Sequence, residues 1–413
     1  MPTAAESPTS TPGAPAHLRL AAGLQEAVEV SLRGHNAALV ALRRELHAHP
    51  ELAWGEYRTT QAVRARLEAA GLQPDPLPRG TGLTCDVGSG EQAVALRADL
   101  DALGVPDEKD VPYSSNIPGH CHACGHDVHT AVVVGAGLVL ADLQRTGLLA
   151  GRVRLVFQPA EEVTPGGALD VIDAGRLQDV RRIFTIHCDP QTPVGQVGLR
   201  VGPITGSADH VRVRLAGRGG HTARPHRTED LVFALGKVIT EVPAVLSRRV
   251  DPRVGMTVVW GRVVAGAAAN VIPRTGEVEG TVRVLDAAAW ELAPTVVADA
   301  VRAVAAPYGV EVEIDYTRGV PPVVNDGAAV EALEASATTF GGPDTVTAAE
   351  QSLGAEDFAW YLGQAPGALA RLGVRRHGDT VSRDLHQGTF DVDEEAIAVG
   401  VRLLVGAALL SLS

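Results

Sequence analysis

Apolar residues recur at helical spacing in several stretches of the first half of the chain, and short apolar runs lie between these stretches. The helical spacing, as at Leu39, Leu42 and Leu46, predicts helices over residues 36–47, 59–70, 129–143 and 167–174. The short runs predict strands over residues 93–98, 154–158 and 182–186. Because strands that alternate with helices form a largely parallel sheet, this half of the chain predicts an α/β domain.

From about residue 207 the pattern changes to short stretches in which apolar and charged residues alternate. Such alternation predicts half-exposed antiparallel strands over residues 210–215, 258–264, 276–284 and 311–316. Two helical stretches, 230–245 and 288–305, lie between these strands. We therefore expect a smaller α+β domain of ferredoxin-like type over residues 207–317. It would be inserted as a lid into a catalytic α/β domain made of residues 17–206 and 318–413.

The two ends of the chain and its overall charge limit where it works. Residues 1–16 are rich in Pro, Ser, Thr and Ala without a basic start, which predicts a disordered lead-in and no signal peptide. The apolar run at 396–412 contains Arg402 and two glycines, so we expect a buried final helix that is too short to span a membrane. A net charge of −13 and 4% aromatic residues argue against a nucleic-acid partner. Four unevenly spaced cysteines suit a reducing compartment, so a cytoplasmic location is expected.

Residues 119–129, GHCHACGHDVH, hold two cysteines, four histidines and an aspartate. Thiolate, imidazole and carboxylate are the side chains that bind divalent transition metals. Cys121 and Cys124 also form a CxxC motif, which is compatible with a redox pair or with half of a structural zinc site. No second CxxC motif is present to complete such a zinc site.

Acidic or imidazole side chains follow each of the three predicted strands of the first domain. These side chains are Asp99, Asp101, Glu161, Glu162 and His187. Open α/β sheets bind ligands beyond the carboxyl ends of their strands. We therefore expect these groups to converge on the site that Cys124 and His126 begin.

An ordered set of motifs resembles one known family. The motifs are RADLDAL (97–103), CHACGHDVHTA (121–131), QPAEE (158–162), GRGGHTARPH (217–226), NVIP (270–273), TVR (281–283), GAEDF (354–358) and LHQGTF (385–390). From about residue 36 to the C-terminus the chain resembles the peptidase-like amidohydrolases, which include hippurate hydrolase, N-acyl-amino-acid deacylases and auxin-conjugate hydrolases. The resemblance implies a metal-dependent amidohydrolase. It would cleave N-acyl amino acids or similar small amide conjugates with a metal-bound water and a glutamate as general base.

Three other hypotheses stay open beside this one. The nearest is a metallopeptidase of the dipeptidase or carboxypeptidase type. A non-catalytic relative that only binds a metal or a ligand is the second, and a thiol oxidoreductase using Cys121 and Cys124 is the third.

The resemblance also implies two divalent metal ions per subunit, with zinc or manganese favoured and cobalt or nickel as alternatives. The ligands would be Cys124, His126, Glu162, His187 and His386. Glu161 would be the general base that takes a proton from water and passes it to the leaving amine. Asp99, Asp101 and Asp127 would lie behind the ligands and orient them. In the dipeptidase and carboxypeptidase branch a metal-binding histidine stands at the position of Asp99.

In the inserted domain, the resemblance implies that His221 reaches the active site of a partner subunit and stabilises the carbonyl oxygen. This arrangement requires a homodimer that forms through the inserted domain. Asn270 and Arg283 match positions that contact the substrate, and the guanidinium fork of an arginine suits the carboxylate of an acyl amino acid. The alternative for Arg283 is a solvated charge on the wet face of a strand. Gly104 departs from the proline that many members carry there, which bears on substrate size.

Overall fold

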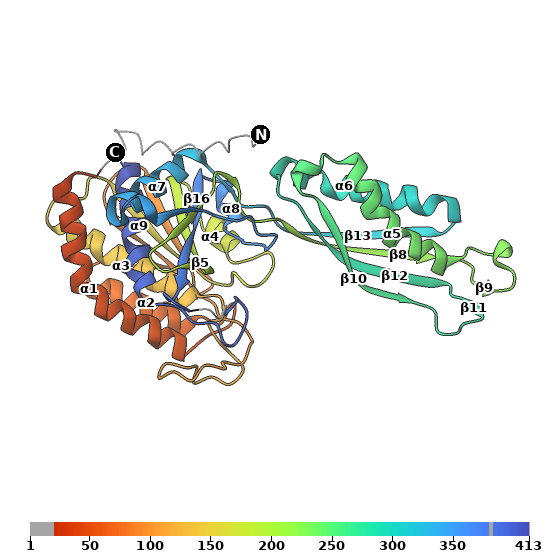
Figure 1. Cartoon of the computed structure of the whole chain (residues 1–413), viewed down its shortest axis with the longest axis horizontal. Helices are drawn as coiled ribbons and strands as arrows, with labels where there is room; N and C mark the ends of the chain where they lie inside the picture. The colour runs from red at the N-terminus through yellow and green to blue at the C-terminus, as the bar shows by residue number, and fades with distance from the viewer. Residues whose placement is uncertain (1–19, 380–382, 413) are drawn as a thin grey trace, which may run out of the picture.

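The computed structural model describes residues 20–379 and 383–412. The predicted lead-in at residues 1–16 lies outside the described residues. Figure 1 shows a larger and a smaller body of secondary structure, joined by extended segments.

The larger body is built on an eight-stranded sheet with the order β1-β2-β4-β3-β5-β16-β6-β15. Its strands are β1 (Asp75–Pro76), β2 (Leu83–Gly88), β3 (Ala93–Asp99), β4 (Arg152–Gln158), β5 (Val180–Pro193), β6 (Val197–Leu199), β15 (Val346–Ala348) and β16 (Gly367–Arg375). The central strands β4, β3, β5 and β16 run parallel, while β1 and β2 are antiparallel to their neighbours. The sheet is therefore mixed with a parallel centre, as the alternation of strands and helices predicted.

Helices pack on this sheet and on one another. They are α1 (Ala22–Ala48), α2 (Tyr57–Ala69), α3 (His126–Arg145), α4 (Ala168–Asp173), α7 (Gly327–Gly341), α8 (Ala359–Leu362) and α9 (Glu395–Leu412). The close packing of α1, α3 and α9 depends on Gly135, where a Cβ atom would lie 2.7 Å from side-chain atoms of both Leu39 and Val401. One continuous apolar core thus supports α3, the helix that follows the metal-like motif.

The last helix corrects one sequence prediction. By length and composition α3 and α9 are both long and apolar enough to cross a membrane, although residues 396–412 were expected to be too short. In the fold, 89% of the most apolar window of α3 and 72% of that of α9 are buried. Their apolar surfaces are therefore occupied by the core, and the prediction of a buried final helix is confirmed.

The smaller body is a four-stranded antiparallel sheet with two helices on one face (Figure 1). Its elements are β8 (Ala208–Ala216), α5 (Leu231–Arg249), β10 (Thr257–Ala265), β12 (Thr275–Arg283), α6 (Ala287–Ala305) and β13 (Glu311–Val320), with the strand order β10-β12-β8-β13. This βαββαβ succession in this order is the ferredoxin-like arrangement. Val211, Val213 and Leu215 of β8 point into its core, while Arg212 and Arg214 form ion pairs on the open face. The predicted alternation is thus confirmed.

Two small pairings complete the fold. β9 (Gly220–His221) pairs with β11 (Val271–Ile272) at the end of the smaller body that is farthest from the large sheet (Figure 1). β7 (Gly202–Pro203) pairs with β14 (Val324–Asn325) within the larger body.

Several predicted elements are longer in the structure. α1 begins at Ala22, fourteen residues before the predicted start, and α3 begins at His126, inside the metal-like motif. β5 was expected to end at His187 but continues to Pro193. The apolar run marks only the fully buried part of this strand, and the polar residues beyond it stay paired with β16. His187 therefore lies within a strand.

Candidate metal centre

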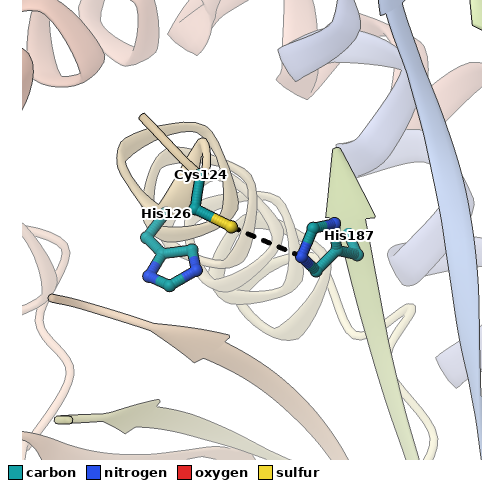
Figure 2. A group of neighbouring side chains, drawn as sticks. All are labelled: Cys124, His126 and His187. Carbon is teal, nitrogen blue, oxygen red and sulfur yellow. Dashed lines mark hydrogen bonds between the residues drawn. The ribbon is translucent and has the colours of Figure 1, made fainter. Parts of the chain in front are cut away.

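The predicted metal ligands lie together at the carboxyl edge of the parallel strands. The ligand atoms of Cys124, His126 and His187 lie within 4.8 Å of one another. Figure 2 shows the thiol of Cys124 pointing at the His187 ring, with Sγ 3.6 Å from Nε2. Two further groups of this kind overlap the first, one made of Cys124, Glu162 and His386 and one made of His126, Glu161 and Glu162. The structure thus brings all five predicted ligands and the predicted base into one cluster.

A single glycine sets the positions of Cys124 and His126. Gly125 precedes α3 with a φ of 85°, in the left-handed region that favours glycine. A Cβ atom there would lie 2.7 Å from Sγ of Cys188. The backbone can therefore turn tightly against β5, which leaves Cys124 before the turn and His126 on the first residue of the helix.

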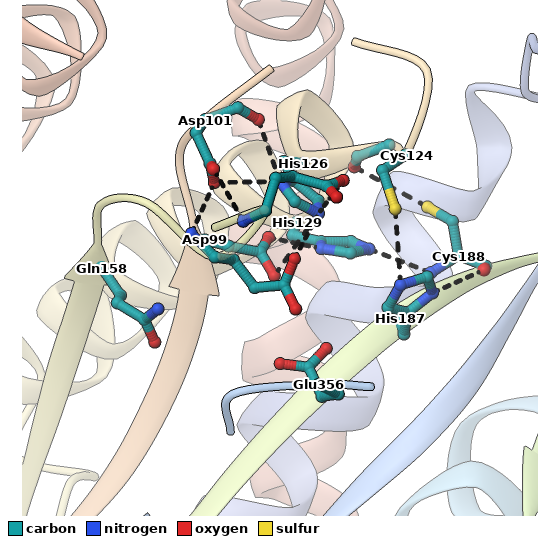
Figure 3. A network of polar contacts seen from close by, with 12 residues as sticks. Asp99, Asp101, Cys124, His126, His129, Gln158, His187, Cys188 and Glu356 are labelled. Atoms are coloured by element: carbon teal, nitrogen blue, oxygen red, sulfur yellow. Dashed lines mark hydrogen bonds and ion pairs between the residues drawn. The ribbon is translucent and has the colours of Figure 1, made fainter. Parts of the chain in front are cut away.

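Asp101 positions the turn that carries both glutamates. Its two carboxylate oxygens accept hydrogen bonds from the backbone N–H groups of Glu161 and Glu162, at 3.0 and 2.9 Å. The backbone carbonyl of Asp101 accepts a hydrogen bond from Nδ1 of His126 at 2.9 Å. The single residue Asp101 thereby fixes Glu161, Glu162 and His126. Figure 3 shows its contact with His126.

Asp99 lies under the cluster and contacts a histidine that the sequence reasoning did not assign. His129 accepts a hydrogen bond from the backbone N–H of Cys188 on Nε2, so its Nδ1 carries the proton that it donates to Asp99, at 2.6 Å. The other oxygen of Asp99 lies 3.7 Å from Nε2 of His126. His129 therefore links α3, β3 and β5 directly behind the ligands (Figure 3). His129 belongs to the motif CHACGHDVHTA (121–131), so the sequence motif already included it.

A buried arginine holds a second layer of carboxylates. Arg97 is fully buried and contacts Asp99 at 2.7 Å, Glu356 at 3.2 Å and Asp357 at 2.7 Å. Burial, opposed by Arg97, raises the pKa of Asp357 to about 8. Burial and the neighbouring carboxylate of Glu356 also raise the pKa of Glu161 well above its usual value.

Asp127 contacts groups on the other side of α3. Its carboxylate lies 2.8 Å from Nε of Arg43 and 2.7 Å from Nδ1 of His47, both on α1. The expected contact with a ligand imidazole is replaced by this buried link between two helices.

His386 approaches the cluster from the C-terminal part of the chain. It has a φ of 63°, and its backbone N–H donates to the carbonyl of Ala123 at 2.8 Å. Its Nε2 lies 3.4 Å from Oε1 of Glu162, and this neighbouring carboxylate raises the pKa of His386. The imidazole thus meets Glu162 at the open side of the cluster.

The residues predicted in the smaller body are divided in space. Arg283 lines a cavity of about 360 Å³ together with Cys124, Glu161, His187 and His386, and its guanidinium donates to the backbone carbonyl of Leu353. His221 and Asn270 do not line this cavity and are exposed at the far tip, beside the β9–β11 pair. Within one chain, the structure therefore brings only Arg283 to the cluster.

The side chains of the cluster fit a divalent metal. Nδ1 of His126 and Nδ1 of His187 each donate to a backbone carbonyl, which leaves Nε2 of both rings unprotonated, with that of His187 facing the thiol of Cys124. Nε2 of His126 and Oε1 of Glu162 are buried without a hydrogen-bond partner in the described chain. Such atoms are costly unless something binds them. A thiol, imidazoles and carboxylates complete a donor set that suits a divalent transition metal.

Glu56 contacts the turn that carries Glu161 and Glu162, and its ionisation makes the stability of the fold depend on pH. Its Oε1 accepts a hydrogen bond from Ala160, at 2.8 Å, while its Oε2 is buried without a partner. Burial raises its pKa from 4.5 to about 7. The native state thus favours the protonated carboxyl. The resulting stability is complete below the unfolded pKa and is lost as the pH rises through the folded pKa.

Replacing Glu56 by glutamine removes this ionisation. The difference in the free energy of unfolding, variant minus wild type, should rise by about 2–3 kcal/mol from pH 4.5 to pH 8. Urea unfolding at several pH values measures the difference. Exposed Glu350 supplies the control variant Glu350→Gln. A difference that stays constant with pH would contradict the assignment.

The chain matches a protein-family profile, a curated relative and a solved structure. The profile of peptidase family M20/M25/M40 matches residues 95–410. An N-acetylcysteine deacetylase of Bacillus subtilis (strain 168) is 36% identical over 383 residues, which cover 92% of this chain and 98% of that protein. The solved structure of a Bacillus subtilis protein described as a dinuclear metal-binding peptidase has a TM-score of 0.81 and 34% identity. That match covers 92% of this chain and 99% of the other.

A further relative, from Rhodococcus jostii (strain RHA1), bears the name of a glutamate–cysteine ligase. It is 50% identical over 369 residues, which cover 89% of this chain and 46% of that protein. The chain therefore spans about half the length of this relative.

The fold, the ligand cluster, the family profile, the N-acetylcysteine deacetylase and the dinuclear peptidase structure define a metal-dependent amide hydrolase. The chain belongs to peptidase family M20/M25/M40.

Proposed function

We propose that the chain hydrolyses the amide bond of N-acyl amino acids or similar small amide conjugates. The observation that carries the proposal is the position of Glu161, which is partly buried beside the ligand cluster and lines the cavity that Arg283 also lines. The name of the Bacillus subtilis deacetylase supports an acyl amino acid as substrate.

Two divalent ions would be held by Cys124, His126, Glu162, His187 and His386. When bound, they would supply a Lewis acid for the scissile carbonyl and acidify water. A thiolate ligand favours zinc, and the carboxylates also suit manganese, cobalt or nickel.

Glu161 is the proton carrier in this proposal. Its carboxylate accepts a proton from water and holds it for the leaving amine, and burial and the carboxylate of Glu356, which raise its pKa well above the usual value, make it a stronger proton acceptor. Asp101 keeps Glu161 and Glu162 on one turn. The two adjacent carboxylates can thus divide the roles of base and ligand.

The proposal includes a homodimer. Residues 17–206 and 318–413 would form the catalytic domain and residues 207–317 the lid. His221 is exposed at the tip that is farthest from the large sheet, which supports a role of its ring in the catalytic centre of another subunit (Figure 1). There it would stabilise the carbonyl oxygen, and Asn270 on the same tip would contact the substrate. The buried free thiols support a cytoplasmic location.

Two alternatives are a thiol oxidoreductase that uses the CxxC motif and a dipeptidase that uses the same metal centre. Cys121 has the ammonium of Lys109 at 3.3 Å from its sulfur, whereas Cys124 points at His187, so the two thiols of the CxxC motif have different neighbours. This favours a ligand role for Cys124 over a redox pair. A dipeptidase would share the centre and differ in the preferred amide.

Hydrolysis of a substrate panel tests the proposal. Purified protein loaded with zinc or manganese is assayed for amine release from N-acetyl amino acids, hippurate and unmodified dipeptides, and its metal content is measured. We expect turnover of acyl amino acids and two ions per chain. Faster turnover of dipeptides would favour the peptidase. A folded, metal-loaded protein that cleaves none of them would overturn the proposal.

A further inference from the structure

Arg371 places a second cation in the cavity, from within the larger body. It lies on β16, where its Cα is paired in register with that of His187 on the parallel neighbour β5. Side chains at paired positions of adjacent strands point to the same face of a sheet. Both line the cavity, together with Glu161 and Arg283. The guanidinium therefore shares the cavity with the predicted base and one of the predicted ligands.

The structure leaves room for this side chain. On its other side Arg371 pairs with Gly198 of β6, where a Cβ atom would lie 3.1 Å from Cβ of Arg371. A larger residue at position 198 would crowd the arginine. The sheet therefore accommodates Arg371 on the face that carries the cluster.

Arg371 differs from the other arginines near the cluster because it has no partner within the described chain. Arg97 is held by three carboxylates, and Arg283 donates to the carbonyl of Leu353. No hydrogen bond or ion pair joins the guanidinium of Arg371 to any residue of 20–379 or 383–412, although its backbone is paired with β5 and β6. The acidic groups whose charges act on it, Glu356 and Asp189, lie beyond ion-pair distance. A partly buried cation without a partner is costly, and a bound anion removes that cost.

We propose that Arg371 binds the carboxylate of the amino-acid part of the substrate, inside the subunit that holds the scissile amide. This inference rests on the proposed function and names the group by which that site selects its substrate. A guanidinium presents parallel donors that match the two oxygens of a carboxylate. Arg371 thus acts as a specificity-determining residue, while Arg283 remains available for the lid side of the cavity.

The test compares each acid with its carboxamide. N-acetyl amino acids and the corresponding N-acetyl amino acid amides differ only in the anionic group. Wild type should prefer the acid. Arg371→Met should lower kcat/KM for the acid by about 10- to 100-fold, mainly through a higher KM, and reduce the amide value much less. Arg371→Lys should recover part of the preference.

Arg375→Met is the matched control, because Arg375 lies on the same strand and does not line the cavity. It should leave the acid-to-amide ratio unchanged. Equal losses on both substrates in Arg371→Met, or a wild-type acid preference in that variant, would overturn the proposal.

Binding separates this inference from the proposed function. The affinity of metal-loaded protein for hippurate is measured by calorimetry in the Glu161→Gln background, with and without Arg371→Met. If wild type cleaves neither substrate, the proposed function fails. Weaker hippurate binding on loss of Arg371 would still support the anchor, and unchanged binding would refute it.

Discussion

Glu161→Gln is expected to lower kcat by about 10²- to 10⁴-fold with little change in metal content. Glutamine retains the size of the side chain and the backbone N–H that donates to Asp101, but its amide cannot accept a proton from water. Burial and the carboxylate of Glu356 raise the pKa of Glu161 well above its usual value, which makes it a stronger proton acceptor than an ordinary carboxylate. Steady-state kinetics on the best substrate of the panel, with metal analysis of the same samples, measures both quantities.

Glu162→Gln separates the base from the ligand. It should lower the metal content as well as kcat, because Oε1 of Glu162 is buried, accepts no hydrogen bond in the described chain and faces the rings of His126 and His386. Glu350→Gln, at an exposed glutamate, should change neither quantity. If Glu161→Gln kept wild-type kcat, or lost its metal as Glu162→Gln does, Glu161 would not be the general base.

Much of this centre could be predicted because its residues follow strands. Asp99, Asp101 and the two glutamates come directly after apolar runs, and parallel strands carry whatever follows them to one edge of the sheet. The family motifs added His386, which no local pattern would have connected to the cluster. Helical spacing and apolar runs also located α2, α3, β3 and β4, whereas β2, β16 and α7 were not predicted.

The residues that the sequence did not reveal have partners that lie far away along the chain. Arg97 contacts Asp357 across 260 positions, and Arg371 meets His187 only through strand pairing. Nothing in local spacing predicts such partners. The end of β5 was misplaced for a related reason, because its polar residues are held by pairing with β16 and not by apolar burial. For Arg371 no motif gave a signal, whereas Glu356 lay in the quoted GAEDF segment.

The position of His221 predicts complementation between two inactive variants. His221→Ala alone should lower kcat by about 10²- to 10³-fold, because a donor to the carbonyl oxygen is lost. In a mixed dimer with Glu161→Gln, one of the two centres would combine an intact Glu161 with an intact His221 from the other subunit. Mixing equal amounts should therefore restore about a quarter of wild-type activity if subunits exchange at random.

The activity of the mixture is followed over time, with differently tagged subunits to show that exchange has occurred. Each variant incubated alone should stay inactive, and His210→Ala, at an exposed histidine on β8, should keep wild-type activity. Exchange without recovery would show that His221 acts in its own chain or not at all. For His221 to act in its own chain, the tip that carries β9 would have to move to the large sheet. This tip lies at the end of the smaller body that is farthest from that sheet (Figure 1). Recovery would establish that the catalytic centre is completed by a second subunit.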